Sequence, residues 1–211
     1  MPYLNEFLML TLIHFLAVMS PGPDFAVIVR QSISFDRKTA LITSAGIGAG
    51  IAVHMAYTLL GLGFIITQSE IGFLIAQIVG ICYLSSLAFK LLNSKANIAL
   101  NQDIQVDHNP RHHQKAFMLG VMTNILNPKA TLFFLAIFTT VVNITTPMTV
   151  QVIYALWVIL TTFLWFSLVS IFFSQKKIRA KFVSHGYIFE RIMGSVILIF
   201  AGKLLWELKL F

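Results

Sequence analysis

The chain has 211 residues, of which 57% are hydrophobic and only 11% are charged, and its mean hydropathy is +0.83. Soluble domains carry about 25% charged residues, so this composition excludes an ordinary water-soluble fold. The formal net charge of +7 comes from Lys and Arg residues in short segments between apolar stretches, not along one helix face. This pattern indicates a membrane surface as the partner, and no nucleic acid.

Six apolar stretches are long enough to cross a lipid bilayer, which takes about 20 apolar residues in a helix. The charge-free stretch 130–175 would extend about 70 Å as one helix, so it contains two spans joined by a polar turn at residues 143–147. The predicted spans cover residues 4–29, 39–67, 71–92, 116–142, 148–173 and 188–206, and the last has charged residues close to both ends.

The two halves of the chain correspond to each other. A shift of 107 residues carries Pro21 onto Pro128 and residues 39–67 onto residues 146–174. Three spans per half is an odd number, so the second half would insert upside down, as in many secondary transporters. We therefore expect an all-α fold of six transmembrane helices, with a 3+3 inverted repeat in which helices one and four are broken. The single domain, 1–211, would consist of half-repeats 1–92 and 115–211, joined by a cytoplasmic loop, 93–114.

The positions of the basic residues predict the orientation. Twelve of the 15 Lys and Arg residues lie in or beside the segments that follow spans one, three and five. The segments after spans two and four contain none. Because cytoplasmic loops are enriched in Lys and Arg, the sequence predicts a protein of the bacterial inner membrane with both termini on the periplasmic side.

Prolines interrupt spans one and four at corresponding places, in Ser20-Pro21-Gly22-Pro23-Asp24 and in Asn127-Pro128-Lys129. Proline lacks an N–H and clashes with the carbonyl four residues earlier, so both helices should kink or unwind there. Backbone groups freed at membrane depth must face protein or water, and the paired breaks therefore predict a polar cavity. The alternative is a structural kink without a ligand.

Asp24 and Lys129 are the acid and the base beside these breaks. Each costs about 2.5 to 3.5 kcal/mol near the centre of a span, which favours a shared, water-filled cavity. In that cavity Asp24 would meet a substrate ammonium or a proton, and Lys129 would meet a substrate carboxylate. The alternatives are that Asp24 caps the helix that resumes at Phe25 and that Lys129 extends to a lipid headgroup.

Two histidines are candidates for proton coupling together with Asp24. His14 lies seven residues before the first break proline, on the same helical face, and His54 continues a four-residue stripe formed by Gly46 and Gly50. A neutral imidazole can relay protons, and a stripe of small residues allows two helices to approach closely. The alternative for each histidine is a packing role inside the bundle.

No other part of the sequence predicts a metal site or an enzyme. His108, His112 and His113 lie in a polar segment without acidic or cysteine partners at suitable spacing. The chain has no Gly-x-Ser-x-Gly turn, phosphate-binding loop or His-Glu-x-x-His helix, so we expect neither catalysis nor an ATP-driven pump. The basic run 176–181 is expected to bind anionic lipids at the inner surface.

Several motifs together give the chain a resemblance to a known family. They are Met19-Ser20-Pro21-Gly22-Pro23-Asp24, the Gly46/Gly48/Gly50 helix with His54 and Gly61-Leu62-Gly63, and Asn124-Ile125-Leu126-Asn127-Pro128-Lys129 followed by Leu132-Phe133-Phe134. Their order and spacing, with the chain length and the six-span plan, resemble the LysE/RhtB family of amino-acid exporters. The resemblance implies efflux of amino acids or derivatives such as homoserine, threonine, lysine or leucine across the inner membrane. It also implies proton antiport and no organic cofactor.

Three positions depart from the family pattern. The usual Pro-Gln pair is replaced by Thr139-Thr140, Gly-Arg-Arg is replaced by Asp36-Arg37-Lys38, and a basic residue ahead of Tyr83-Leu84 is replaced by Gln77. If that basic residue helps to select the substrate in the family, its replacement by Gln77 changes the substrate class.

We predict a secondary transporter that exports amino acids or their derivatives. Its expected partners are an amino acid, protons and membrane lipids, and assembly into a homo-oligomer stays open. Two other classes also stay open: a non-transporting membrane protein whose kinks fit an oligomer interface, and an exporter of inorganic ions. Proton coupling is assigned to Asp24, His14 and His54, and the predicted substrate-binding residues are Pro21, Gly22, Pro23, Asp24, Asn124, Asn127, Pro128 and Lys129.

Overall fold

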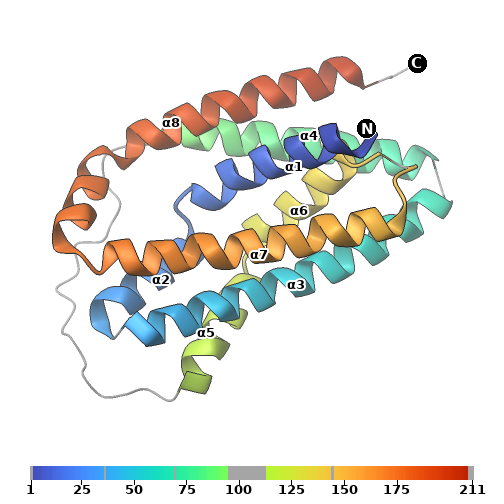
Figure 1. Cartoon of the computed structure of the whole chain (residues 1–211). Helices are drawn as coiled ribbons and strands as arrows, with labels where there is room; N and C mark the ends of the chain where they lie inside the picture. Colours follow the sequence, from blue (N-terminus) through green and yellow to red (C-terminus); the bar gives the residue numbers. More distant parts are fainter. Residues whose placement is uncertain (1, 36, 69, 95–112, 144, 209–211) are drawn as a thin grey trace.

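The structure is a computed structural model that describes residues 2–94, except 36 and 69, and residues 113–208, except 144. The described residues form eight α-helices and no strand (Figure 1). Most of the predicted loop 93–114, including His108 and His112, lies outside the described residues. In chain order the helices are α1 (Pro2–Met19), α2 (Pro23–Ser34), α3 (Arg37–Gln68), α4 (Glu70–Leu92), α5 (His113–Ile125), α6 (Pro128–Val141), α7 (Met148–Phe173) and α8 (Lys176–Glu207).

The helices confirm the predicted all-α membrane architecture. α3, α4 and α7 are single helices with apolar stretches long enough to span a membrane. α1 with α2 and α5 with α6 form two bent pairs, with bends of 56° and 58°. By length and composition, each bent pair also qualifies as one span. The bends lie at Pro21 and Pro128, as predicted for spans one and four.

The sixth predicted span lies within a longer helix than expected. α8 begins at Lys176, twelve residues before the start of the predicted span at residue 188. The basic residues after Lys176 disfavour burial in lipid but not helix formation, because Lys and Arg are good helix formers. Glu190, Arg191 and Lys203 place three charged residues in the apolar part of α8, which does not qualify as a span by length and composition as the other five predicted spans do.

The two halves repeat the same order of elements, a bent pair followed by two long helices. The corresponding helices α3 and α7 pack against each other, as do α4 and α8. Figure 1 shows that α1 starts and α8 ends at the same end of the bundle. This is the order of elements that the predicted inverted repeat requires.

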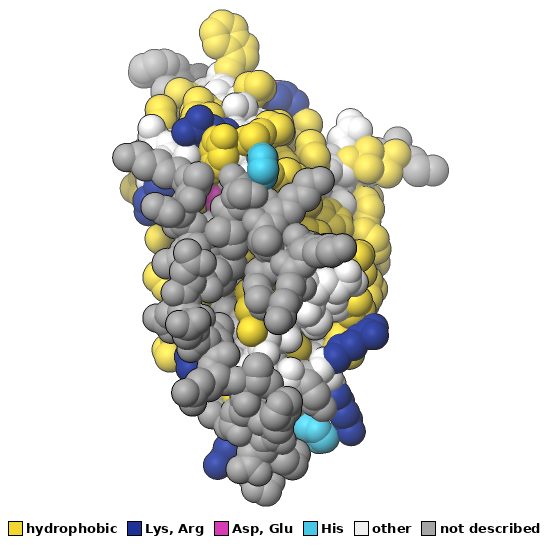
Figure 2. Space-filling model, turned by 90° about the vertical axis from the view of Figure 1, so that its left-hand side faces the viewer, with side chains coloured by type: hydrophobic (Ala, Val, Ile, Leu, Met, Phe, Trp, Pro, Cys, Tyr) yellow, Lys and Arg dark blue, Asp and Glu magenta, His cyan; other side chains and the backbone are white. Residues whose placement is uncertain are grey.

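The opposite end of the bundle, where α2 ends and α8 begins, is the basic end. Figure 2 views the molecule from this end and shows Lys and Arg side chains around its rim. The elements that start or finish here carry Arg30, Arg37, Lys38 and Lys90. Under the rule that basic residues stay inside, this end would face the cytoplasm, and the orientation of the termini stays a prediction.

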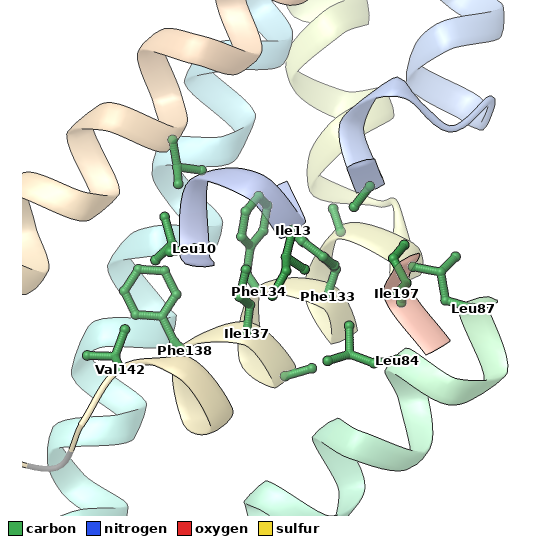
Figure 3. Packing of buried hydrophobic residues seen from close by; sticks show 14 of the residues in the cluster. Leu10, Ile13, Leu84, Leu87, Phe133, Phe134, Ile137, Phe138, Val142 and Ile197 are labelled. Atoms are coloured by element: carbon green, nitrogen blue, oxygen red, sulfur yellow. The ribbon is translucent and has the colours of Figure 1, made fainter. Parts of the chain in front are cut away.

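The larger hydrophobic core surrounds α6, which places this helix inside the bundle. Phe133, Phe134, Ile137 and Phe138 of α6 are all at most 4% exposed. Figure 3 shows these side chains packed against residues of α1, α4 and α8, including Leu10, Ile13, Leu84, Leu87 and Ile197. A smaller core joins α2 to α7, where the rings of Phe25 and Phe173 meet edge to face at 5.2 Å.

Glycines allow α3 and α5 to cross in direct backbone contact. A Cβ atom on Gly46 would lie 2.1 Å from the carbonyl oxygen of Phe117, and one on Gly120 would lie 2.2 Å from that of Thr43. A Cβ atom on Gly50 would meet the side chain of Asn124 at 2.7 Å. The stripe of small residues therefore has the predicted packing role, and it brings the end of α5 against α3.

Glu6 ties the outer end of α1 to the turn between α6 and α7. Its carboxylate accepts hydrogen bonds from the Thr146 hydroxyl at 2.9 and 3.0 Å, from the Asn143 N–H at 3.3 Å and from the Tyr154 hydroxyl at 3.4 Å. The polar turn at residues 143–147 is thus predicted by the sequence, but its anchor to α1 is not, because one acidic residue near a terminus carries no pattern.

Replacing Glu6 by leucine is expected to lower the stability of the bundle. The change removes the charged acceptor of the Thr146 hydroxyl and the Asn143 N–H, at a cost of roughly 1 to 2 kcal/mol, whereas the Tyr154 hydroxyl keeps the carbonyl of Tyr3 at 2.8 Å. For a chain of this size, that cost corresponds to a fall in melting temperature of about 2 to 8 °C, measurable in detergent. Glu207→Leu is the control, because Glu207 is exposed and makes only an ion pair with Lys203 one turn away. Equal melting temperatures for the two variants would contradict the anchoring role.

Candidate functional site

The break between α1 and α2 results from two prolines and a glycine. α1 ends at Met19, and Gly22 is the N-cap of α2 with an extended backbone. Pro23 occupies the first helical position, where its missing N–H leaves no hydrogen bond unmade. Asp24 follows in the first turn of α2, where the positive end of the helix dipole favours a carboxylate. The structure gives α2 no side-chain cap, so the alternative that Asp24 is the N-cap is wrong.

The break between α5 and α6 presents two asparagines to the first break. Asn127 is the N-cap of α6, because its Oδ1 accepts the Lys129 N–H at 3.0 Å. Its Nδ2 donates to Oδ2 of Asp24 at 3.1 Å, and Nδ2 of Asn124 donates to the same oxygen at 2.9 Å. The side chains at the two breaks are therefore in direct contact.

Asp24 keeps one oxygen unused. Oδ2 receives both asparagine donors, whereas Oδ1 is buried and has no hydrogen-bond partner among the described residues. An ionised carboxylate accepts hydrogen bonds only, so a donor from outside the described protein would satisfy Oδ1. A buried polar atom without a partner is rare and costly, which makes this oxygen a candidate ligand contact.

Lys129 caps the end of α1 from the opposite break. Its Nζ donates to Oγ of Ser20 at 3.0 Å, to the Ser20 carbonyl at 3.3 Å and to the Ala17 carbonyl at 3.4 Å. The last carbonyls of a helix have no partner within the helix and carry its negative end, so a cation is favourable there. Lys129 therefore does not extend to a lipid headgroup, and no described carboxylate lies within ion-pair distance of it.

His54 makes the equivalent cap on the other half. Its Nε2 lies 2.9 Å from the carbonyl oxygen of Asn124, in the last turn of α5, and its Nδ1 bonds the hydroxyl of Tyr57. The shift of 107 residues that relates the halves carries Ala17 onto Asn124. At the end of each of these two helices, a side-chain nitrogen therefore binds a backbone carbonyl. Lys129 does so for α1 and His54 for α5.

The two breaks border a small, partly open cavity. Polar groups lie along its wall at the breaks, and aromatic and aliphatic side chains form much of the remainder. Drug-sized and metabolite sites commonly combine such an apolar wall with a few directed polar groups. The lining residues are His14, Ala17, Val18, Ser20, Gly22, Asp24, Phe25, Ile51, Asn127, Lys129, Ala130, Phe133, Phe134, Thr162 and Phe166.

His14 forms a second polar position in the cavity wall. It is 1% exposed, and its Nε2 lies 3.2 Å from the hydroxyl of Thr162 on α7. Its Nδ1 has no hydrogen-bond partner among the described residues. His14 therefore combines a packing position with a free ring nitrogen, whereas both nitrogens of His54 are engaged and His54 does not line the cavity.

The structure brings together most of the predicted site residues. Gly22, Asp24, Asn127 and Lys129 line one cavity, and Asn124 reaches it through its bond to Asp24. The prolines at positions 21, 23 and 128 form the breaks and do not line the cavity. Sequence reasoning missed Ser20 and Thr162 as site residues. Ser20 could have been found, because a hydroxyl beside a break proline is free to bind outside its own helix.

The departures from the family pattern lie elsewhere. Gln77 and Thr140 line a separate groove between α4 and the end of α8. α6 continues without a break through Thr139, whose hydroxyl donates to carbonyls of its own helix. The described residues contain no group of three or more His, Cys, Asp or Glu side chains that could hold a metal ion.

A bundle of apolar helices with two broken spans, whose charged side chains line one internal cavity, defines a polytopic membrane protein with the broken-helix plan that many secondary transporters share. The chain belongs to the LysE type translocator family, whose sequence model matches residues 15–208.

Curated relatives cover most of the chain. The threonine efflux protein of Escherichia coli (strain K12) is 30% identical over 178 residues, which are 82% of this chain and 84% of that protein. The uncharacterized membrane protein YahN of the same organism is 28% identical over 89% of this chain and 83% of its own length. An uncharacterized membrane protein of Haemophilus influenzae is 25% identical over 94% of this chain and 95% of its own length. No solved structure matches the chain.

Proposed function

We propose that this protein exports amino acids or close derivatives across the bacterial inner membrane in exchange for protons. Membership of the translocator family and the relative named threonine efflux protein support an amino-acid exporter. The observation that carries the proposal is the free Oδ1 of Asp24, which is buried at the meeting point of both breaks and lines the cavity.

A substrate ammonium fits this position better than other common groups. It supplies the donor that Oδ1 lacks, and its positive charge pairs with the carboxylate that the two asparagines hold in place. The aromatic and aliphatic wall formed by Phe133, Phe134 and Phe166 leaves apolar space beside that charge for an uncharged side chain. The site therefore suits a small amine-bearing metabolite rather than a bare metal ion.

Alternating access would follow from the repeat. If the half-repeats 1–92 and 115–211 rock against each other, the contacts between the breaks lie at the centre of the motion and can be reached from each side in turn. The predicted proton-coupling residues differ in their positions, because Asp24 and His14 line the cavity and His54 caps α5 behind it. With the basic end inside, both termini would face the periplasm.

Counterflow in proteoliposomes tests the proposal. Vesicles are loaded with unlabelled threonine, homoserine, leucine or lysine and diluted into the same amino acid in labelled form, and an exporter should accumulate the label transiently for at least one of them. A pH gradient that is acidic on the side of the predicted periplasmic face should drive the labelled substrate toward that side. If no amino acid supports flux above that of empty vesicles, the chain is not an amino-acid exporter.

A further inference from the structure

The amine of Lys129 occupies a position of the kind that a coupling ion takes in other secondary transporters. In those proteins, unwound backbone carbonyls and the C-terminal ends of broken helices coordinate the ion. Here the carbonyls of Ala17 and Ser20 and the Ser20 hydroxyl, at the broken end of α1, all face one ammonium at 3.0 to 3.4 Å. The protein thus carries its own cation in this oxygen cage.

A permanent cap for α1 would not need a lysine. A neutral amide can donate to two carbonyls without placing a charge inside the bundle, and Lys129 lies in the first turn of α6, where the helix dipole disfavours a cation. What lysine adds over an amide or an arginine is an amine that can release its proton. The choice of residue therefore points to a group that changes its charge.

We propose that Lys129 carries the coupling proton. The ammonium of Lys129 and the ammonium of the substrate alternate as the single positive charge at the oxygen cage and beside Asp24. This inference rests on the proposed function and assigns its coupling step to one residue. It differs from the sequence-based hypothesis, in which Lys129 binds a substrate carboxylate.

The charged and titratable groups around Lys129 are compatible with this exchange. The charges of Asp24 on α2 and Glu190 on α8 act on Lys129 from a distance, and neither makes an ion pair with it within 4 Å. The Tyr83 hydroxyl on α4 donates to the backbone carbonyl of Lys129 at 2.9 Å, and His14 on α1 lines the same cavity. His54 on α3 faces Asn124. The cage itself consists of neutral oxygens, so the amine can leave without stranding a paired carboxylate.

The step conserves charge. On the cytoplasmic side, a substrate ammonium binds at Oδ1 of Asp24 and the cage while the N–H bond of Lys129 breaks and its proton passes to water on that side. After the halves have rocked, the substrate leaves on the outer side and the neutral amine takes a proton from water there. One substrate moves outward for each proton that moves inward, and one positive charge stays beside Asp24 throughout.

Two substitutions at Lys129 separate this role from carboxylate binding. Lys129→Gln cannot hold a proton, so accumulation of labelled threonine driven by a pH gradient should fall by a much larger factor than exchange of labelled threonine in counterflow. The half-saturation concentration of Lys129→Gln should no longer change with pH. That of the wild type should rise up to about tenfold per pH unit on acidification, which is the limit when one proton competes with the substrate. Lys129→Arg keeps its charge at all accessible pH values, so it should block both counterflow and driven transport.

A carboxylate-binding Lys129 predicts the reverse, and that outcome would overturn the inference. Arginine would then replace lysine with retained transport, and glutamine would raise the half-saturation concentration at every pH. Lys203→Gln is the matched control, because Lys203 is exposed on α8 and pairs only with Glu207. Failure of the wild type to exchange any amino acid would instead count against the proposed function, so the two failures are distinguishable.

Discussion

Asp24→Asn is expected to weaken substrate binding strongly while leaving the bundle folded. The new amide can keep its oxygen toward the donors of Asn124 and Asn127, which places its NH2 group toward the cavity where Oδ1 now lies. A donor then faces the substrate ammonium, and the negative charge is gone. Loss of a charged hydrogen bond of about 1.5 to 3 kcal/mol corresponds to a fall in substrate affinity of roughly 10 to 150-fold. Initial rates of counterflow with labelled threonine measure this effect.

Two observations keep this result interpretable. The melting temperature of Asp24→Asn in detergent should equal that of the wild type within a few degrees, because both asparagine contacts have an acceptor. Glu207→Gln serves as a control for removal of a carboxylate that lies outside the cavity. Unchanged counterflow in Asp24→Asn would show that the free oxygen of Asp24 does not bind the substrate.

The positions of the two breaks could be predicted because proline acts through its own backbone. Pro21 and Pro128 end their helices whatever surrounds them, and their correspondence at a shift of 107 residues is visible in the sequence alone. The cost of charge in a span then predicts that Asp24 and Lys129 share one polar cavity. Both side chains line one cavity, but much of its wall is aromatic and aliphatic.

The partners of those charges could not be predicted. Lys129 reaches the end of α1, and Asp24 reaches the asparagines of the other break. Both contacts depend on bends of 56° and 58° and on how the halves pack. The opposite charges of Asp24 and Lys129 suggest an ion pair. Instead, Asp24 binds asparagines at the second break, and Lys129 binds Ser20 at the end of α1. The same holds for Glu6, whose contacts come from α7 and from the turn before it.

The start of α8 and the contacts of Gly120 show two further limits of sequence patterns. Hydropathy reports where a helix can meet lipid, so it underestimates a helix that continues beyond the apolar region, as α8 does from Lys176. A stripe such as Gly46 and Gly50 predicts one side of a close helix pair. The partner helix α5 contributes the single Gly120, which is not part of a stripe of small residues. Its role is visible only from the backbone atoms of α3 that an added Cβ would contact.

Gly120→Ala is expected to have the largest effect on folding. An added Cβ would lie 2.2 Å from the Thr43 carbonyl oxygen and 2.9 Å from the Ile47 nitrogen, and both are backbone atoms that no rotamer change can move aside. α5 must then shift from α3, which costs about 1 to 3 kcal/mol or more for overpacking and separates the groups that hold Asn124. We expect a lower yield of folded protein and a melting temperature at least about 2 °C below that of the wild type, measured in detergent.

Gly61→Ala provides the matched control for Gly120→Ala, because an added Cβ there meets nothing within 4 Å. Both glycines lie within helices, where alanine is favoured over glycine by up to about 1 kcal/mol, so the two substitutions share the same intrinsic gain. Gly61→Ala should therefore be neutral or slightly stabilising. The difference in melting temperature between the two variants isolates the contact between α3 and α5. A shift of α5 would also affect function, because Nε2 of His54 on α3 lies 2.9 Å from the Asn124 carbonyl in the last turn of α5. If both variants melt alike, the two helices do not cross in backbone contact.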